Sequence, residues 1–382
     1  MPIYKMDGKK DGLQKYRVRI NYTDSIGKNK QIDRVAYGKE EAKELERKLN
    51  LNLKEETQSK ITVQQLYDEY INVKQYEVRE ATIDKSKKLL TTFILPHLKN
   101  YRLDKLTASV LQSWKNQMEQ ETTSTGQSFS LKYKRNIFGE LRALLNYAVK
   151  MEYIGKNPLS VLGNFKDANL MKKEMDFYTP KEFKTFISAA RDQAEQSESN
   201  SQNIYEWHFY VFFNIAFFTG MRKGEIYALK WSDISDTTIK VSRSIAQKLR
   251  GGDRETPPKN QSSIRTIDVP LPLKKVLDEH YDRCKSIAGF SDDWRICGGE
   301  RCIRDSTLEH RNKDYAELAG IKKIRIHDFR HSHASFLANN GINIQEIARR
   351  LGHSNIEITW NIYSHLYPHE NERAIEVLNK IV

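Results

Sequence analysis

Within the first 50 residues, one stretch alternates apolar and basic residues, and this period of two is typical of β-strands. In the stretch 15–22 one face would carry Tyr16, Val18, Ile20 and Tyr22, and the other Lys15, Arg17 and Arg19. A turn at 24–31 and a second strand at 31–38 follow, and the polar stretch 39–50 is rich in helix formers. We therefore predict a module at 1–58, built as a three-stranded sheet with one helix.

The period changes to that of a helix beyond residue 60, which predicts a helical domain over 59–163. Helices are expected at 62–73, 81–95, 107–120 and 130–154. Thr62 and Gln65 form a capping box for the first. Pro96 should end the second, and Gly155 the fourth. The polar face of the fourth helix begins with Lys132, Lys134 and Arg135, which would suit backbone phosphates.

A segment without clear period at 164–177 reads as a linker, and a larger domain is predicted over 178–382. Thr179 should cap its first helix, and an aromatic helix at 206–220 reads as buried core ended by Gly220. Strands are expected at 237–245 and 263–269. A later helix should bury Phe329, Phe336 and Leu337, and the last should start at a capping box, Ser354–Glu357.

The charge balance suggests a polyanionic partner. The chain has 382 residues, with 63 Lys and Arg against 50 Asp and Glu, a net charge of +13. The first 60 residues alone hold 15 basic against 10 acidic residues. Nucleic acid is the usual partner of such an excess, and the cationic strand face would suit a DNA groove unless it is simply a solvated face. A membrane surface is the rival, but no apolar run approaches the roughly 18 residues that a spanning helix needs.

Cysteine usage and the N-terminus point to a reducing cytoplasm. The N-terminus has no apolar stretch after its basic residues, so it does not read as a secretory signal. Three cysteines, Cys284, Cys297 and Cys302, fit reduced thiols better than a disulfide framework. Cys297 and Cys302 with nearby His310 could suggest a metal, but no second ligand pair completes a site.

Several short motifs could carry chemistry, although each has a structural alternative. Arg222 follows the Gly220 break, and it could equally form a structural ion pair with Glu225. His327 and Arg330 share a face at a helix start, and His353 follows the helix-ending Gly352. We interpret His331 and His333 as helix-packing or polar neighbours of these motifs. Tyr363 and Tyr367 lie four residues apart near the C-terminus, where an aromatic pair could simply pack against a core.

Taken together, these motifs resemble the tyrosine recombinases, the phage integrase group. The stretches TGMRKGE, TPPKNQSSIRTI, HDFRHSH, LGHSNIEIT and NIYSH carry the family's pattern in order, as Arg222, Lys259, His327, Arg330, His353 and Tyr363. In that family the nucleophilic tyrosine follows the LGH histidine by ten positions, which selects Tyr363 over Tyr367. The resemblance covers about 165 to 382, and the N-terminal parts match the family's layout.

The resemblance implies a fold and a reaction. The fold would be multidomain and mainly α, with an arm-type DNA-binding domain at 1–58, a helical core-site domain at 59–163 and an α+β catalytic domain. Tyr363 would attack a DNA phosphorus, Arg222 and Arg330 would clamp the phosphate, and His353 would hydrogen-bond it. His327 would be the base and Lys259 the general acid, although Lys248 precedes the same turn. No metal, ATP or other cofactor is expected.

The resemblance also implies partners and leaves two rival functions open. Partners would be double-stranded DNA at core and arm sites, a tetramer formed through the C-terminal tail, and an excisionase or host DNA-bending protein. The tail helix could instead pack on its own domain. The rivals to an integrase are a type IB topoisomerase, against which the tail and the separate N-terminal modules argue, and a non-catalytic DNA-binding regulator.

Overall fold

The computed structural model describes residues 3–23, 29–58, 61–166, 175–247, 253–257, 261–366, 375 and 378–379. The chain divides into two compact units, Met1–Met171 and Lys172–Val382, and the division falls inside the segment 164–177. The first unit holds two separate hydrophobic cores. Phe165, at the start of the expected linker, is fully buried in the second of these cores, because the chain still packs against the helical domain there.

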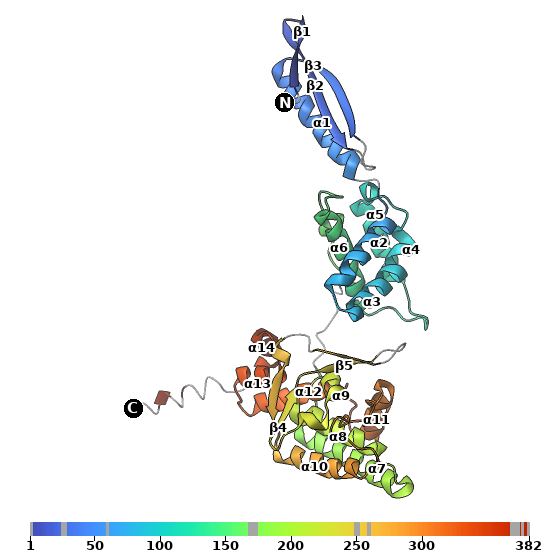
Figure 1. Ribbon diagram of the computed structural model, residues 1–382, viewed down its shortest axis with the longest axis vertical. Helices are drawn as coiled ribbons and strands as arrows, with labels where there is room; N and C mark the ends of the chain where they lie inside the picture. Colours follow the sequence, from blue (N-terminus) through green and yellow to red (C-terminus); the bar gives the residue numbers. More distant parts are fainter. Residues whose placement is uncertain are drawn as a thin grey trace. The chain divides into compact units, whose positions relative to one another are not determined.

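The N-terminal module is a three-stranded antiparallel sheet with one helix, as predicted. Its strands are β1 (Ile3–Lys10), β2 (Leu13–Thr23) and β3 (Asn29–Tyr37), in that spatial order. Helix α1 (Lys39–Gln58) packs on the apolar face of β2, where Val18 and Ala42 are fully buried (Figure 1). The alternation along β2 therefore places its basic residues on the opposite face.

The helical domain has its core between α2 (Val63–Glu77), α5 (Ala108–Gln120) and α6 (Leu131–Lys150). Smaller elements complete it: α3 (Glu80–Leu89), a π-helical turn η1 (Leu90–Ile94), α4 (Leu95–Leu98), η2 (Leu103–Lys105) and η3 (Pro158–Val161). The predicted capping box of Thr62 and Gln65 is confirmed. Helix α6 ends at Lys150, five residues before Gly155, so the predicted end of this helix was wrong.

Pro96 does not end the helical path, contrary to the prediction. The chain passes from α3 through η1 into α4, with Pro96 in the first turn of α4. In η1 the Leu95 N–H bonds the carbonyl of Leu90, five residues back, instead of four. This wider turn lets a new α-segment begin at the proline, where the missing N–H has no intrahelical acceptor to lose.

The second unit is mainly helical and is built around α8 (Tyr205–Thr219), whose residues are buried on all sides. Around it lie α7 (Pro180–Ser201), α9 (Lys223–Ala228), η4 (Trp231–Asp233), α10 (Leu271–Lys285), α11 (Asp305–Leu318) and α12 (Asp328–Asn339). A second small core joins α12 to α13 (Ile344–Leu351) and α14 (Ile356–Tyr363), which is followed by η6 (Ser364–Leu366). The predicted Thr179 cap and the Gly220 end of α8 are confirmed.

Two short sheets replace the long strands expected in this unit. The predicted strand 237–245 is two strands, because β4 (Thr238–Val241) pairs with β7 (Arg265–Asp268) while β5 (Ser244–Ala246) pairs with β6 (Arg254–Thr256). Before β7 lies η5 (Gln261–Ser263), so the second predicted strand starts late. β5 packs closely on α9, where a Cβ on Gly224 would come within 2.6 Å of the Ser244 hydroxyl.

Two local predictions near the C-terminus were wrong. Asn355, not Ser354, caps α14, because its side chain accepts from the Glu357 N–H. Phe336 on α12 is 41% exposed, although Phe329, seven residues earlier on the same helix, is buried. Within the described residues no helix has the length and apolarity to cross a membrane, and no three His, Cys, Asp or Glu side chains gather as a metal-binding group. The cysteines are buried free thiols.

Candidate active site

Arg222 is presented by a sharp turn between two helices. Gly220 ends α8 in the left-handed conformation, with φ of 64°, and Arg222 is the N-cap residue of α9. A side chain at Gly220 would clash with His333, 2.7 Å from the ideal Cβ, so the turn fits only glycine. The Arg222 guanidinium donates to Glu225 Oε1 at 3.0 Å and to the carbonyl of Gly352 at 3.2 Å. The structural ion pair with Glu225 is therefore present, and it orients the Arg222 guanidinium.

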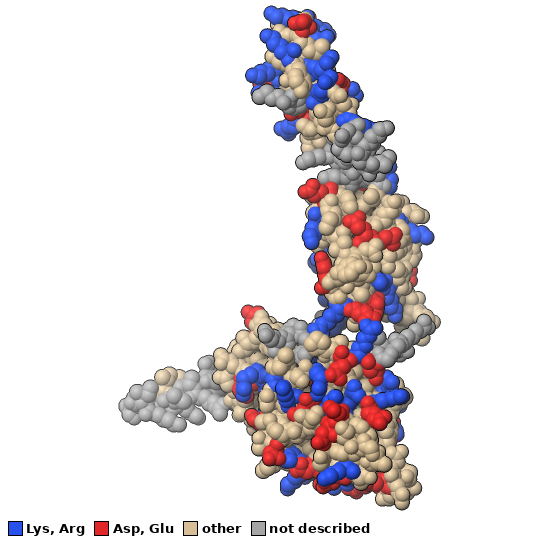
Figure 2. Space-filling view, viewed as in Figure 1, with Lys and Arg blue, Asp and Glu red and all other residues tan. Residues whose placement is uncertain are grey.

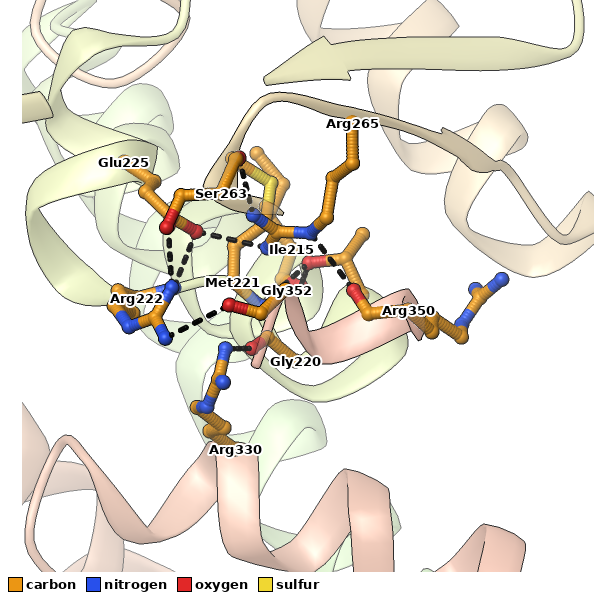
Figure 3. A network of polar contacts seen from close by, with 11 residues as sticks. Ile215, Gly220, Met221, Arg222, Glu225, Ser263, Arg265, Arg330, Arg350 and Gly352 are labelled. Carbon is orange, nitrogen blue, oxygen red and sulfur yellow. Dashed lines mark hydrogen bonds and ion pairs between the residues drawn. The ribbon is translucent and has the colours of Figure 1, made fainter. Parts of the chain in front are cut away.

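Glu225 is a buried carboxylate shared by two arginines. Its Oε2 accepts from the Arg222 backbone N–H at 3.0 Å and from Arg265 Nη2 at 2.8 Å. Burial alone would raise the pKa of Glu225, but the Arg265 hydrogen bond and charge outweigh it and hold the pKa below its usual value. Glu225 thus stays ionised and fixes both cations (Figure 3).

Arg330 lies on α12 with only 3% of its surface exposed. Its Nη1 donates to the carbonyl of Gly220 at 2.7 Å, while its buried Nη2 has no hydrogen-bond partner among the described residues. Burial, followed by the charge of Arg222, lowers the pKa of Arg330 to about 9. A buried cationic donor without an acceptor is costly, and a bound anion would satisfy it.

His353 follows Gly352, which ends α13 in the left-handed conformation as the sequence predicts. Its Nδ1 lies 2.7 Å from the hydroxyl of Thr359, a fully buried residue of α14. Burial, followed by the charges of Arg330 and Arg222, lowers the pKa of His353 to about 4. The imidazole is therefore neutral at pH 7, and its Nδ1 is engaged by Thr359.

Tyr363 is the last residue of α14 and is only 2% exposed. Its hydroxyl lies 2.5 Å from Nδ1 of His331 on α12. Burial raises the pKa of Tyr363 above its usual value, and the charge of Arg330 opposes that rise. Burial also lowers the pKa of His331 to about 4. A protonated tyrosine therefore faces a neutral imidazole, which is a donor–acceptor pair.

This contact makes His331 a polar neighbour of the tyrosine, one of the two interpretations that the sequence left open for it. His331 contacts the Tyr363 hydroxyl. The exposed His327 lies beside His331, with the centroids of the two imidazole rings 5.1 Å apart. The signal was present, since His327 and His331 are four apart and so share a helix face. His333 does pack, with its Nδ1 2.8 Å from the Phe217 carbonyl.

Arg222, Arg330, His353 and Tyr363 thus gather within one unit. Other predicted features of the site cannot be placed in it. Lys259, Lys248, Tyr367 and nearly all of the C-terminal tail lie outside the described residues. In the sequence, β5 and β6 precede Lys259, and η5 and β7 follow it. The lysine's part in the site therefore stays a prediction.

The predicted DNA contacts separate into exposed and buried cations. Lys132 and Arg135 are exposed, although Arg135 Nε donates to the Phe165 carbonyl at 2.9 Å. Lys134 is wrong as a phosphate contact, because it is buried and its Nζ pairs with Glu119 Oε2. On β2, Lys15 and Arg17 are partly exposed, and Arg19 pairs with Asp33 at 2.9 Å. Figure 2 shows Lys and Arg abundant on the visible face of the N-terminal module.

Comparison with known proteins matches this site to a family. The sequence profile described as "Phage integrase family" matches residues 177–370, which include every predicted catalytic position. The chain belongs to the phage integrase family. A second profile, the N-terminal SAM-like domain of phage integrases, matches residues 62–118 in the helical domain. Site-specific DNA recombination is the activity that this membership gives the chain.

Individual relatives span nearly the whole integrase chain. The ICEBs1 integrase of Bacillus subtilis (strain 168) is 26% identical over 383 residues, covering 97% of this chain and 98% of the relative. The integrase of Staphylococcus phage L54a is 24% identical and covers 88% and 99%. A Tn1549 transposon integrase in complex with transposon right end DNA has the same fold, with a TM-score of 0.65 at 23% identity over 84% of this chain and 100% of that one.

Proposed function

We propose that this integrase cleaves and rejoins DNA at specific sites through a 3′-phosphotyrosyl link to Tyr363, and so integrates or excises a mobile element. The observation that supports it most is the buried Nη2 of Arg330, which has no partner among the described residues and lies in the same cluster as Arg222 and Tyr363. A phosphodiester brings the anionic oxygens that such a donor needs. The topoisomerase and regulator alternatives are not favoured by the family membership.

The reaction exchanges one phosphoester bond for another. The Tyr363 oxygen attacks phosphorus, the bond from phosphorus to the deoxyribose O5′ breaks, and the 5′-hydroxyl leaves with a proton. Negative charge gathers on the non-bridging oxygens in the transition state, where Arg222 and Arg330 would donate paired hydrogen bonds. His353 would add a further donor. The tyrosyl ester keeps the bond energy, so rejoining by another 5′-hydroxyl needs no ATP.

The attacking tyrosine must give up its proton, and two histidines could accept it. The family resemblance assigns that role to His327, whereas the 2.5 Å contact favours His331. The low pKa of His331, about 4, leaves its imidazole unprotonated at pH 7 and free to accept. We propose His331 as the first acceptor of the tyrosine proton. His327 beside it would be the next group to carry that proton.

The two histidines can be separated by matched substitutions. Replacing His331 by Phe keeps a ring but removes the acceptor, and we expect cleavage at pH 7 to slow by about 100-fold or more. Cleavage should recover in part at pH 9, where more tyrosinate forms without a base. Single-turnover cleavage of a nicked core site measures both rates, with His327→Phe as the matched control. A His331→Phe enzyme at wild-type speed beside a slow His327→Phe enzyme would return the role to His327.

The leaving oxygen and the assembly involve parts outside the described residues. Lys259 would protonate the departing 5′-oxygen, and no metal would be required. Double-stranded DNA at core sites is the expected partner, contacted by residues such as Lys132, with arm sites bound by Lys15 and Arg17 on the N-terminal sheet. A tetramer linked by C-terminal tails, aided by an excisionase or a host DNA-bending protein in the bacterial cytoplasm, would complete the complex.

Covalent capture tests the proposal directly. The full chain is mixed with sheared genomic DNA from its own source in the presence of EDTA, then denatured with SDS. We expect a protein–DNA adduct that survives denaturation, and sequencing of the attached ends should converge on one core sequence. Capture that appears only when Mg²⁺ replaces EDTA would overturn the metal-independent chemistry. The absence of any adduct, also on nicked core-like substrates, would overturn the covalent mechanism.

A further inference from the structure

We propose that Arg265 is a positioning residue that fixes Arg222 and the His353 turn relative to each other; this inference rests on the proposed function. Arg265 is the first residue of β7, and its side chain is only 6% exposed. It lies within the stretch TPPKNQSSIRTI, in which only Lys259 was expected to have a role. It stands at the centre of the polar network in Figure 3, between three segments that are far apart in the sequence.

Each nitrogen of the Arg265 guanidinium has a partner on a different segment. Nη2 donates to Glu225 Oε2 on α9 at 2.8 Å, and Nε donates to the carbonyl of Arg350 on α13 at 2.8 Å. Nη1 donates to the carbonyl of Ser263 in η5 at 3.0 Å. Arg330, by contrast, keeps a nitrogen without a partner in the same part of the described structure. Arg265 is therefore arranged to hold protein groups, whereas Arg330 is arranged to hold a ligand.

The shared carboxylate connects Arg265 to the phosphate clamp. Glu225 uses Oε1 for the Arg222 guanidinium and Oε2 for Arg265 and the Arg222 N–H. Without Arg265 one side of this buried carboxylate loses its cation, and Glu225 would reorient toward Arg222. That reorientation would pull the Arg222 guanidinium away from the phosphate and neutralise more of its charge.

The same arginine supports the turn that presents His353. A Cβ on Gly352 would lie 3.0 Å from Arg265 Nη1 and 3.1 Å from the Ser262 carbonyl, so this turn is packed directly against Arg265. The carbonyl of Gly352 also accepts from Arg222. Arg265 thus completes a ring of contacts. Arg222 binds Glu225, Glu225 binds Arg265, Arg265 binds α13, and Gly352 at the end of α13 binds Arg222 again.

The test uses the full-length protein with Arg265→Gln and Arg265→Lys, and Arg350→Gln as the matched control. Arg350 is partly buried and also binds β7, through the carbonyl of Asp268, but within the described structure its side chain does not contact Glu225. We expect Arg265→Gln to slow single-turnover cleavage at saturating core-site DNA by about 100-fold, as small misplacements in active sites do. The Kd for that DNA should change by less than about threefold. Arg265→Lys, which keeps the charge for Glu225, should recover part of the rate.

A double-mutant cycle with Glu225→Gln separates positioning from general stability. If Arg265 acts through Glu225, the two substitutions together should slow cleavage little more than either alone. If the rate losses of the two single variants multiply in the double variant, Arg265 does not act through Glu225 and the inference is overturned. It is also overturned if Arg350→Gln slows cleavage as much as Arg265→Gln at a matched melting temperature, because the role of Arg265 would then be merely structural. If wild type cleaves and Arg265→Gln cleaves equally fast, the inference alone is wrong. If wild type forms no adduct, the proposed function fails first.

Discussion

Tyr363→Phe should abolish the covalent protein–DNA adduct while leaving DNA binding intact. The substitution removes only the nucleophilic oxygen, and the ring that fills the core between α12 and α14 remains. The lost hydrogen bond to His331 should cost about 1 kcal/mol of folding stability. SDS-resistant capture and a binding titration on the same core site measure the two effects separately.

Tyr367→Phe is the matched control for this experiment. It removes a tyrosine hydroxyl four residues further along the chain and should leave capture at the wild-type level. The opposite result, capture lost with Tyr367→Phe and kept with Tyr363→Phe, would move the nucleophile to the second tyrosine and break the ten-residue spacing from His353. Capture by both single variants but not by the double variant would mean that either residue can attack.

Replacing Arg330 should separate catalysis from stability. Arg330→Leu removes a phosphate donor, and we expect single-turnover cleavage to fall by about 1000-fold or more. The melting temperature should change little, because the substitution also removes a buried charge whose pKa is already lowered to about 9 and whose Nη2 has no partner within the described structure. The lost bond to the Gly220 carbonyl limits any gain.

Arg330→Lys provides the informative comparison. A lysine keeps the charge but offers one nitrogen, so it cannot contact the Gly220 carbonyl and a phosphate as a planar guanidinium does. We expect its cleavage rate to lie well below wild type, although above that of Arg330→Leu. Equal rates for wild type and Arg330→Leu on a saturating core site would remove Arg330 from the proposed clamp.

Features with local causes were predictable from sequence. The Thr62 and Thr179 capping boxes depend on residues three apart, and both formed. Gly220 and Gly352 end their helices because the left-handed conformation favours glycine. The order and spacing of the chemistry-bearing motifs located Arg222, Arg330, His353 and Tyr363, which the fold then brings into one unit.

Features decided by distant contacts were not predictable. In the π-helical turn before Pro96, the Phe93 carbonyl accepts from the indole of Trp114 at 3.0 Å, a partner 21 residues away. Arg265 looked like any basic residue on a strand, and only the approach of α9 and α13 buries it. The contact that suggests a role for His331 is its hydrogen bond with Tyr363, which lies 32 residues further along the chain. Propensity and spacing carry no information about such pairs.

The burial of Tyr363 bears on the fidelity of the enzyme in a whole chromosome. A chromosome offers millions of phosphodiesters, and a permanently exposed nucleophile beside an arginine clamp could nick any of them. Because Tyr363 is only 2% exposed and its hydroxyl is bonded to His331, we expect DNA to reach the hydroxyl only after a local shift around the tyrosine. Each 1.4 kcal/mol needed for that shift makes accidental cleavage about tenfold rarer. Only a DNA site whose binding contacts offset this free energy would be cleaved at the full rate.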